Sequence, residues 1–352
     1  MPDARRAEVT RDRSDPRTMS DATPSSTATL GDPIPDVPES SATDHDSREV
    51  SPVVATAPAP SVDAPPVGEP CPTPLVWQEV LAAYRTQSTA WELKNRSHRL
   101  VGRSWGTGRP LYLLNGFAAT AEMSALTLWL LREEFRCVVF DTFEDGKSSK
   151  SRPTMSDFAS DVLAVADHHG DETLNMFGAS FGAAVALQTA LEVPGRIAGL
   201  VLQHGFAQRR LSMSERMLAA LCCRSSRTLA QFPWRRRIQE LNHRRWFPPF
   251  DGTRFEFLVD STGTIPLADL ARRALAVNGF DITSRLGEIV CPVLLLRTEG
   301  EGGLEARSHA QLEQGLRGSR TEWMHSSGLH PALTHPHRLA KLLKTFFPPE
   351  SI

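Results

Sequence analysis

The sequence has no uninterrupted apolar run of about eighteen residues, which is roughly the length that a membrane-spanning helix requires. The first residues are charged, and no apolar segment of the kind found in secretory signals follows them. The five cysteines are odd in number, and none has the spacing of metal ligands. These absences predict a cytoplasmic protein that has no membrane span and no metal or other cofactor.

The first seventy residues lack Phe, Trp and Tyr and contain a single leucine, Leu30. They hold 12 of the 26 prolines, and six Arg stand against thirteen Asp and Glu, a net charge of −7. Such a segment cannot bury enough apolar surface to offset the entropy lost on ordering. We therefore predict that residues 1–73 are a disordered acidic tail.

The rest of the chain alternates short apolar runs with segments of helical length. Runs that are apolar on both faces and alternate with helices are typical of a parallel sheet covered on both sides. We predict a core formed by residues 74–206 and 282–352, interrupted by a helical insertion over residues 207–281. The six runs are Leu111–Leu114, Cys137–Phe140, Leu174–Phe177, Leu200–Leu202, Val293–Leu296 and the weaker Thr321–Met324.

Elements of a different kind precede these runs. Pro74–Tyr84 has the apolar spacing of a helix. Residues around Trp91 alternate in strand fashion, His98–Trp105 is a second strand candidate, and Asn95–Ser97 between them is typical of a hairpin turn. The core is therefore predicted to begin with a helix and an antiparallel pair.

Residues Gly178-Ala179-Ser180-Phe181-Gly182 match the pattern G-x-S-x-G. In this pattern a strand turns sharply into a helix, and glycines two residues either side of the serine leave room for the turn. The apolar run before Gly178 and the small apolar residues after Gly182 supply that context. Ser180 is therefore the candidate nucleophile, and the alternative is a serine at a glycine-rich helix start without chemistry.

A serine nucleophile needs a base, and the base needs an orienting acid. Glu301 follows the Val293–Leu296 run at the offset expected for the acid, with Glu299 as the alternative. His330 follows the last run, in a loop before a predicted final helix, and is the candidate base. Three other histidines lie close by in the sequence and are competing candidates for the base: His325, His335 and His337. The alternative for Glu299 and Glu301 is that both are solvated loop residues.

The negative charge that develops on the substrate oxygen requires hydrogen-bond donors. The N–H of Phe181, next to the serine, is the first candidate. The loop after the first parallel run begins Asn115-Gly116-Phe117, and Gly116 would let the backbone present the N–H of Phe117 as the second.

These motifs together resemble the α/β-hydrolase family over residues 88–348. The resemblance implies an eight-stranded, mostly parallel sheet with a cap inserted after the sixth strand. The chain departs from the family pattern where Asn115 replaces a histidine, Glu301 replaces an aspartate, and Leu329 separates Gly328 from His330. The matching pieces are residues 113–117, 140–141 with 145–148, 178–182, 292–296 and 328–336.

Two shorter stretches, Asn115–Thr120 and Ala274–Asn278, resemble the acyltransferase branch that joins hydroxyacyl chains in rhamnolipid synthesis. That resemblance implies an asparagine in the oxyanion loop and a carrier-bound acyl substrate.

The predicted insertion is rich in arginine. Residues 207–250 contain ten arginines and two glutamates, a net charge of +8, with interleaved aromatic residues. A positive surface of this kind favours anionic partners: an acyl carrier, a coenzyme A phosphate or an acidic membrane surface. The alternatives are a solvated helix face and a patch that the acidic tail covers. No nucleic-acid-binding module is present, so we do not expect a nucleic-acid partner.

The sequence therefore predicts a serine enzyme that cleaves or transfers the acyl group of an ester or thioester through an acyl-enzyme. Hydrolysis and acyl transfer use the same residues, so the pattern does not separate them. The other hypotheses are a non-catalytic binding protein on the same fold and C–C bond cleavage by the same residues.

Overall fold

The computed structural model describes residues 76–96, 98–144 and 152–348. The predicted tail, residues 1–73, and the motif at residues 145–148 lie outside the described residues.

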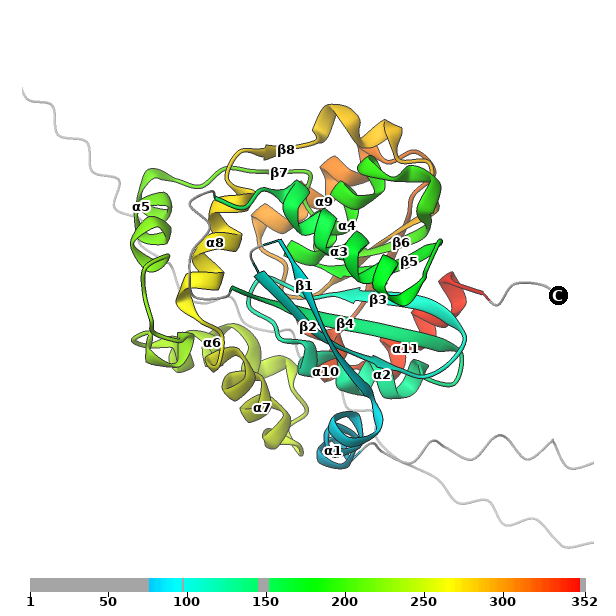
Figure 1. Ribbon diagram of the computed structural model, residues 1–352. Helices are drawn as coiled ribbons and strands as arrows, with labels where there is room; N and C mark the ends of the chain where they lie inside the picture. Colours follow the sequence, from blue (N-terminus) through cyan, green and yellow to red (C-terminus); the bar gives the residue numbers. More distant parts are fainter. Residues whose placement is uncertain (1–75, 97, 145–151, 349–352) are drawn as a thin grey trace, which may run out of the picture. The chain divides into compact units, whose positions relative to one another are not determined.

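An eight-stranded sheet forms the centre of the described chain (Figure 1). Strands β1, β2 and β4 pair antiparallel, and every pair from β4 to β10 is parallel. The predicted fold class is confirmed. In spatial order the strands are β1 (Thr89–Asn95), β2 (His98–Trp105), β4 (Phe135–Glu144), β3 (Arg109–Leu114), β5 (Leu174–Ala179), β6 (Ile197–Gln203), β9 (Val293–Thr298) and β10 (Arg320–Met324).

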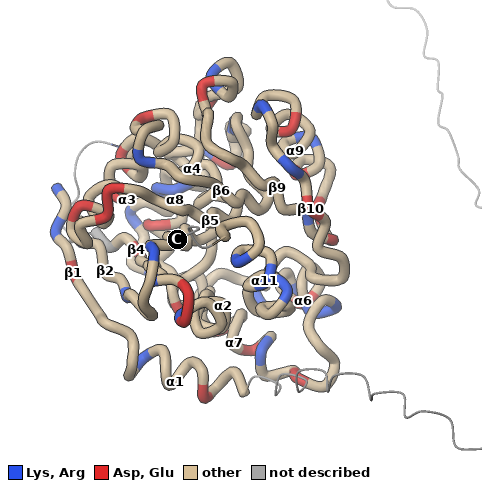
Figure 2. The backbone as a smooth tube through the Cα atoms, turned by 90° about the vertical axis from the view of Figure 1, so that its right-hand side faces the viewer, with Lys and Arg blue, Asp and Glu red and all other residues tan. Residues whose placement is uncertain are grey.

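Helices cover both faces of the sheet (Figure 2). One face packs against α1 (Trp77–Gln87), α2 (Ala125–Leu131) and α11 (Pro336–Phe346). The other packs against α3 (Met155–His169), α4 (Phe181–Glu192) and α9 (Gly303–Gly315).

Strand β3 shows why its residues are apolar on both sides. Tyr112 and Leu114 join the core beneath α3 and α4, while Leu111 and Leu113 join the core beneath α2 and α11. Successive side chains of a strand point to opposite faces, so a strand buried on both sides must be apolar throughout.

The predicted hairpin is also present. Asn95 pairs with His98 at its end, and Arg96 has a φ of 53°, the left-handed conformation that tight turns use. The helix predicted at Pro74–Tyr84 is found three residues further on, as α1.

The segment between β6 and β9, residues 207–281, is called the cap below. It contains α5 (Met213–Cys222), α6 (Arg235–His243), α7 (Gly252–Gly263) and α8 (Leu267–Val277). Phe255 and Leu258 of α7 pack against Met123 and Leu126 of the core. Two short strands that the sequence did not suggest, β7 (Gln208–Arg209) and β8 (Phe280–Asp281), pair where the cap begins and ends.

The remaining elements are short. The four-residue helix α10 (Pro331–Thr334) precedes α11. Short 3₁₀ helices lie at Ala121–Ser124, Pro194–Arg196, Leu229–Gln231, Arg244–Trp246 and Thr283–Glu288. In the part of the chain that the structure describes, no helix combines the length and apolar character needed to cross a bilayer.

Candidate active site

Ser180 lies at the sharp turn between β5 and α4. Its φ of 50° and ψ of −107° place a non-glycine residue in a sparsely populated backbone region, and such conformations persist only where the surroundings enforce them. One constraint is the hydrogen bond that the Ser180 N–H donates to the Gln203 carbonyl at the end of β6, at 2.7 Å. The strained turn is therefore held by the neighbouring strand.

The two glycines of the motif are required by close backbone approach. A Cβ at Gly182 would lie 2.1 Å from the carbonyl oxygen of Leu114, and one at Gly178 would lie 2.6 Å from the Cα of Ala183. Neither contact can be relieved by moving a flexible side chain. The two glycines of the pattern G-x-S-x-G are therefore required because β3, β5 and α4 pack tightly around the serine.

Ser180 lines a cavity of about 660 Å³ between the sheet and the cap. His330 lines the same cavity, as do the oxyanion-loop residues Asn115, Gly116 and Phe117. Most of the remaining lining is apolar, and α5, α8 and the segment between α5 and α6 contribute the part of it that comes from the cap side. The fold therefore brings the candidate nucleophile, base and oxyanion loop to one chamber at the carboxyl edge of the sheet.

Both candidate oxyanion donors are available for a ligand. Phe181 opens α4, and the first N–H groups of an α-helix have no intrahelical acceptor. Among the described residues, the Phe117 N–H donates no backbone hydrogen bond. The two rings meet edge to face with centroids 6.2 Å apart, so the two backbone segments are close neighbours.

Asn115 stabilises the oxyanion loop through the partly buried carboxylate of Asp141. Its side-chain amide donates to Oδ1 of Asp141 at 3.3 Å, and the Ala121 N–H donates to Oδ2 at 3.0 Å. Burial raises the pKa of Asp141, and these two hydrogen bonds act in the opposite direction. The residue that replaces the expected histidine therefore ties the end of β3 to the end of β4.

Arg273 of α8 connects the cap to the same loop. Its Nη1 donates to the carbonyl of Phe117 at 2.8 Å, and its guanidinium lies 6.0 Å from the Phe181 ring centroid. Burial lowers the pKa of Arg273, while the carboxylates of Asp141 and Asp269 counteract this effect. A cation from the cap thus holds the peptide that follows the candidate donor at Phe117.

His330 lies just before α10 and packs against a second histidine from the cap. The rings of His330 and His243 meet edge to face with centroids 4.7 Å apart. Burial, together with the neighbouring His243 and His204, lowers the pKa of His330 to about 3. The imidazole is therefore neutral at neutral pH and able to accept a proton.

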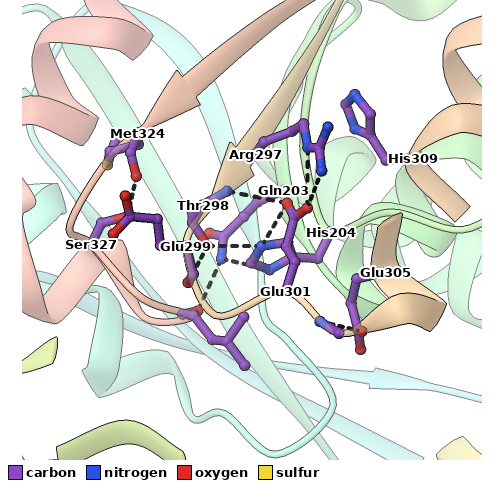
Figure 3. Close-up of polar contacts among 12 residues, drawn as sticks. Gln203, His204, Arg297, Thr298, Glu299, Glu301, Glu305, His309, Met324 and Ser327 are labelled. Atoms are coloured by element: carbon purple, nitrogen blue, oxygen red, sulfur yellow. Dashed lines mark hydrogen bonds and ion pairs between the residues drawn. The ribbon is translucent and has the colours of Figure 1, made fainter. Parts of the chain in front are cut away.

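Glu301 contacts a different histidine from the one expected (Figure 3). Arg297 donates to its Oε2 at 2.8 and 3.1 Å, and the Thr298 N–H donates to its Oε1 at 3.2 Å. Nε2 of His204 lies 3.4 Å from the same Oε1. Within the described residues, no hydrogen bond joins Glu301 to His330.

The environment of Glu301 favours its ionised form. Burial opposes ionisation, but the contacts with His204, Arg297 and the Thr298 N–H outweigh it and lower the pKa of Glu301 to about 2. His204 has a φ of 49°, lies 2.8 Å from the Thr298 hydroxyl and lines the same cavity as Ser180. Glu301 thus fixes a second imidazole at the edge of the chamber.

Glu299, the alternative acid, holds the loop that leads to His330. Its Oε2 accepts the N–H of Ser326 at 2.9 Å, and its Oε1 lies 3.4 Å from Nδ1 of the exposed His325. None of the three competing histidines, His325, His335 and His337, belongs to the lining of the cavity. His330 is therefore the histidine of its loop that shares a chamber with Ser180.

Sequence reasoning missed His204 and Arg273. His204 directly follows β6, two residues after the Leu200–Leu202 run, at the sheet edge where functional side chains gather, so its position carried a usable signal. Arg273 was one of many cap arginines, and only the folded chain shows that this one contacts the oxyanion loop. No group of three His, Cys, Asp or Glu side chains in the described part of the chain is arranged to hold a metal ion.

Comparisons with known proteins agree with this architecture. A family model described as the alpha/beta hydrolase fold matches residues 109–220. A hydrolase from Pseudomonas aeruginosa is 21% identical with a TM-score of 0.60, over 73% of this chain and 97% of that one.

Two further solved structures are similar to this chain. An enol-lactonase from Burkholderia xenovorans is 17% identical with a TM-score of 0.62, over 73% of this chain and 99% of that one. A thermophilic esterase from Thermogutta terrifontis, with malate bound, is 22% identical with a TM-score of 0.62, over 73% and 97%. The chain therefore has the α/β-hydrolase fold, and residues 109–220 match the model of the alpha/beta hydrolase fold family.

Proposed function

We propose that the protein is a serine hydrolase that cleaves a carboxylic ester or thioester through an acyl-enzyme on Ser180. The observation that carries this proposal is the strained serine at the turn from β5 to α4, in one cavity with His330 and the oxyanion loop. Strained backbone conformations of non-glycine residues cluster at active sites, which supports this proposal.

In the proposed first half-reaction, His330 accepts the Ser180 hydroxyl proton as the oxygen attacks the substrate carbonyl. The N–H groups of Phe117 and Phe181 hold the resulting oxyanion, and the loss of one such donor typically costs about 3 kcal/mol of transition-state stabilisation. The C–O or C–S bond to the leaving group then breaks, and His330 returns the proton to that group. Water repeats the sequence on the acyl-enzyme and releases the carboxylic acid.

The cavity favours an apolar acyl group. Leu218, Leu270 and Val277 of the cap line it together with Phe206 and Leu329 of the core. Apolar pockets with a few convergent polar groups bind ligands by burying their apolar surface. We therefore place the acyl chain beneath the cap, with its carbonyl carbon at Ser180.

Glu301 has a positional role in this proposal. It keeps His204 fixed beside the chamber, and His204 is one of the groups that lower the pKa of His330. Glu299 supports the loop that carries His330. Comparing Glu301→Gln with Glu299→Gln separates the two, because the residue that supports the base more strongly will lower kcat further when it is replaced.

A fluorophosphonate probe tests the proposal, since it reacts with activated serines. The intact protein should be labelled, Ser180→Ala should not, and His330→Ala should be labelled far more slowly. Ser308 lines the same cavity away from the turn, so Ser308→Ala is the matched control and should keep full labelling. Labelling that survives in Ser180→Ala would contradict the proposal.

A specific observation favours one alternative, a non-catalytic binding protein. His330 has no carboxylate partner among the described residues, and its pKa of about 3 makes it a weak base. A binding protein would resist the probe at every pH, while apolar carboxylic acids or esters would still bind in the cavity and raise the melting temperature.

The acyl acceptor decides between a hydrolase and an acyltransferase. An alcohol that replaced water in the second half-reaction would form a new ester, and the carrier-bound hydroxyacyl substrates implied by the resemblance are candidates for that chemistry. Incubating the enzyme with a hydroxyacyl thioester and analysing the products distinguishes free acid from a joined ester.

A further inference from the structure

The cap leaves several large apolar side chains exposed to water. On α5, Met213, Met217 and Leu221 recur four residues apart and are 67%, 68% and 74% exposed. Residues at this spacing share one helix face, and such a face is normally buried. On and before α6, Trp234, Ile238 and Leu241 are spaced four and three residues apart and are 79%, 48% and 65% exposed.

The same stretch exposes cations. Residues 207–250 carry a net charge of +8, and some of the arginines are used within the cap: Arg236 pairs with Glu240 and Glu256. Glu215, one of the two acids in this stretch, caps the start of α5 through Ser212. Arg216, Arg224 and Arg227 lie exposed on or next to α5, so positive charge borders its apolar face.

This surface is continuous with the cavity. Leu218 of α5 is 51% exposed and Phe232 is 38% exposed, and both also line the chamber that holds Ser180. In Figure 1, α5 and α6 lie at the outer side of the cap. An apolar molecule lying on the cap would therefore meet apolar side chains from the outer surface to the serine.

We propose that this face of the cap, formed by α5, α6 and the segment between them, binds an anionic lipid surface. Apolar side chains enter the boundary between headgroups and acyl chains, and arginines pair with headgroup phosphates. A water-soluble acyl carrier would satisfy the arginines but leave Trp234, which is 79% exposed, without an apolar partner. A second copy would bring two segments of like charge together.

Delivery of an acyl substrate from that surface into the cavity rests on the proposed function, whereas binding to the surface does not. The two are therefore measured separately. Sedimentation with vesicles measures binding, and hydrolysis of a short, water-soluble ester without vesicles measures catalysis.

The vesicles are phosphatidylcholine alone and an equal mixture of phosphatidylcholine and phosphatidylglycerol. The full chain should bind the anionic vesicles, and the binding should weaken as added salt screens the charges. Replacing Arg216, Arg224 and Arg227 together by Gln should weaken binding on the order of a hundredfold, because each cation near an anionic surface contributes about 1 kcal/mol. Arg320→Gln, an exposed arginine of β10, should bind as the parent does.

A second set of variants tests the contribution of the exposed apolar side chains to vesicle binding. Leu221→Gln with Trp234→Gln should reduce binding at least tenfold, and Val290→Gln, which alters an 80% exposed residue outside the cap, should not. Vesicles with brominated acyl chains should quench the fluorescence of the parent more than that of Trp234→Phe. Hydrolysis of the short ester should be unchanged in all of these variants.

Three results would overturn the proposal. The first is a failure to bind anionic vesicles. The second is vesicle binding that the cap variants leave unchanged. The third is a soluble complex in place of vesicle binding, either with an acyl carrier protein and lost in the arginine variant, or between two copies and lost in the apolar variant.

Discussion

The turn at Ser180 depends on two residues that have no side chain. Gly182→Ala would place a Cβ 2.1 Å from the Leu114 carbonyl oxygen, and the backbone must shift to relieve the contact. We expect the free energy of unfolding to fall by about 1–3 kcal/mol, the usual cost of overpacking. Gly195→Ala is the control, because nothing lies within 4 Å of its added Cβ. Equal stability of the two variants in urea unfolding would refute this account.

The protonation of His330 predicts an unusual pH profile. Its pKa is lowered to about 3, so the neutral base is fully populated above that value and is lost only as the pH falls towards it. We expect kcat/KM to stay level between about pH 5 and 8, where an ordinary histidine with a pKa near 6.5 would titrate. A decline with a midpoint near 6.5 would show that the base is not in this environment.

A substitution at His243 tests why the pKa of His330 is lowered. Replacing His243 by Ala removes a neighbouring charge and admits water beside His330, and both changes favour the protonated form. The acid limb of the profile should therefore move to higher pH. His168→Ala is a control, because His168 packs against Trp91 and His169 rather than His330.

At this scale the sequence indicated which residues gather but not how they pair. Ser180, His330 and the oxyanion loop could be assigned because each follows an apolar run that ends at one edge of the sheet. The partner of Glu301 could not, because it depends on side-chain direction. His204 and His330 reach the same chamber from different strands, and no spacing along the chain shows which of the two imidazoles contacts the carboxylate of Glu301.

Among the elements, α8 couples the cap to the candidate catalytic loop through Arg273. Arg273→Met removes the bond to the Phe117 carbonyl and frees the loop that carries a candidate oxyanion donor. We expect kcat to fall about 10- to 100-fold with KM little changed, since small displacements of catalytic groups have effects of this size.

The neighbouring Arg272 provides the control for this prediction. It pairs with Asp269 on the same helix at 3.0 Å, so Arg272→Met perturbs α8 without breaking the contact to the loop. Steady-state kinetics on a short ester should show a much smaller loss in kcat. If both variants lose kcat equally, the effect belongs to the helix and not to Arg273.

The elements also show which secondary structure the sequence patterns could predict and which they could not. The long parallel strands were predictable because burial on both faces demands continuous apolar runs. Strands β7 and β8 have two residues each, too few to display any period. The shift of α1 relative to Pro74–Tyr84 has a similar origin, since Val76 at its start makes no side-chain cap hydrogen bond and no strong local signal fixes the first turn.

For the whole molecule, Glu301 links stability to pH. Its pKa is lowered to about 2 in the folded chain, against about 4.3 in an unfolded one. Its ionisation therefore stabilises the fold above about pH 4.3 and is lost as the pH falls towards 2. This difference in the pKa of Glu301 corresponds to a contribution of up to about 3 kcal/mol to the free energy of unfolding at neutral pH.

Denaturant unfolding of Glu301→Gln measures this contribution. The variant should be less stable than the parent at pH 7, and the difference should shrink as the pH falls from about 4.3 towards 2. Glu288→Gln removes a surface carboxylate that pairs with Arg285, and should change stability little at any pH. A difference that does not vary with pH would show that the lost contacts, and not the charge, are responsible.

The short pairing of β7 with β8 has a consequence for the history of the chain. Gln208 pairs with Asp281, and Arg209 pairs with Phe280. The two ends of the cap therefore lie side by side. Paired residues in antiparallel strands are only about 5 Å apart, a gap that a short turn can close. Recombination at these paired residues would replace the cap and leave the sheet and its helices unchanged. Because the cap lines the cavity, such an exchange offers a simple route to a new substrate specificity.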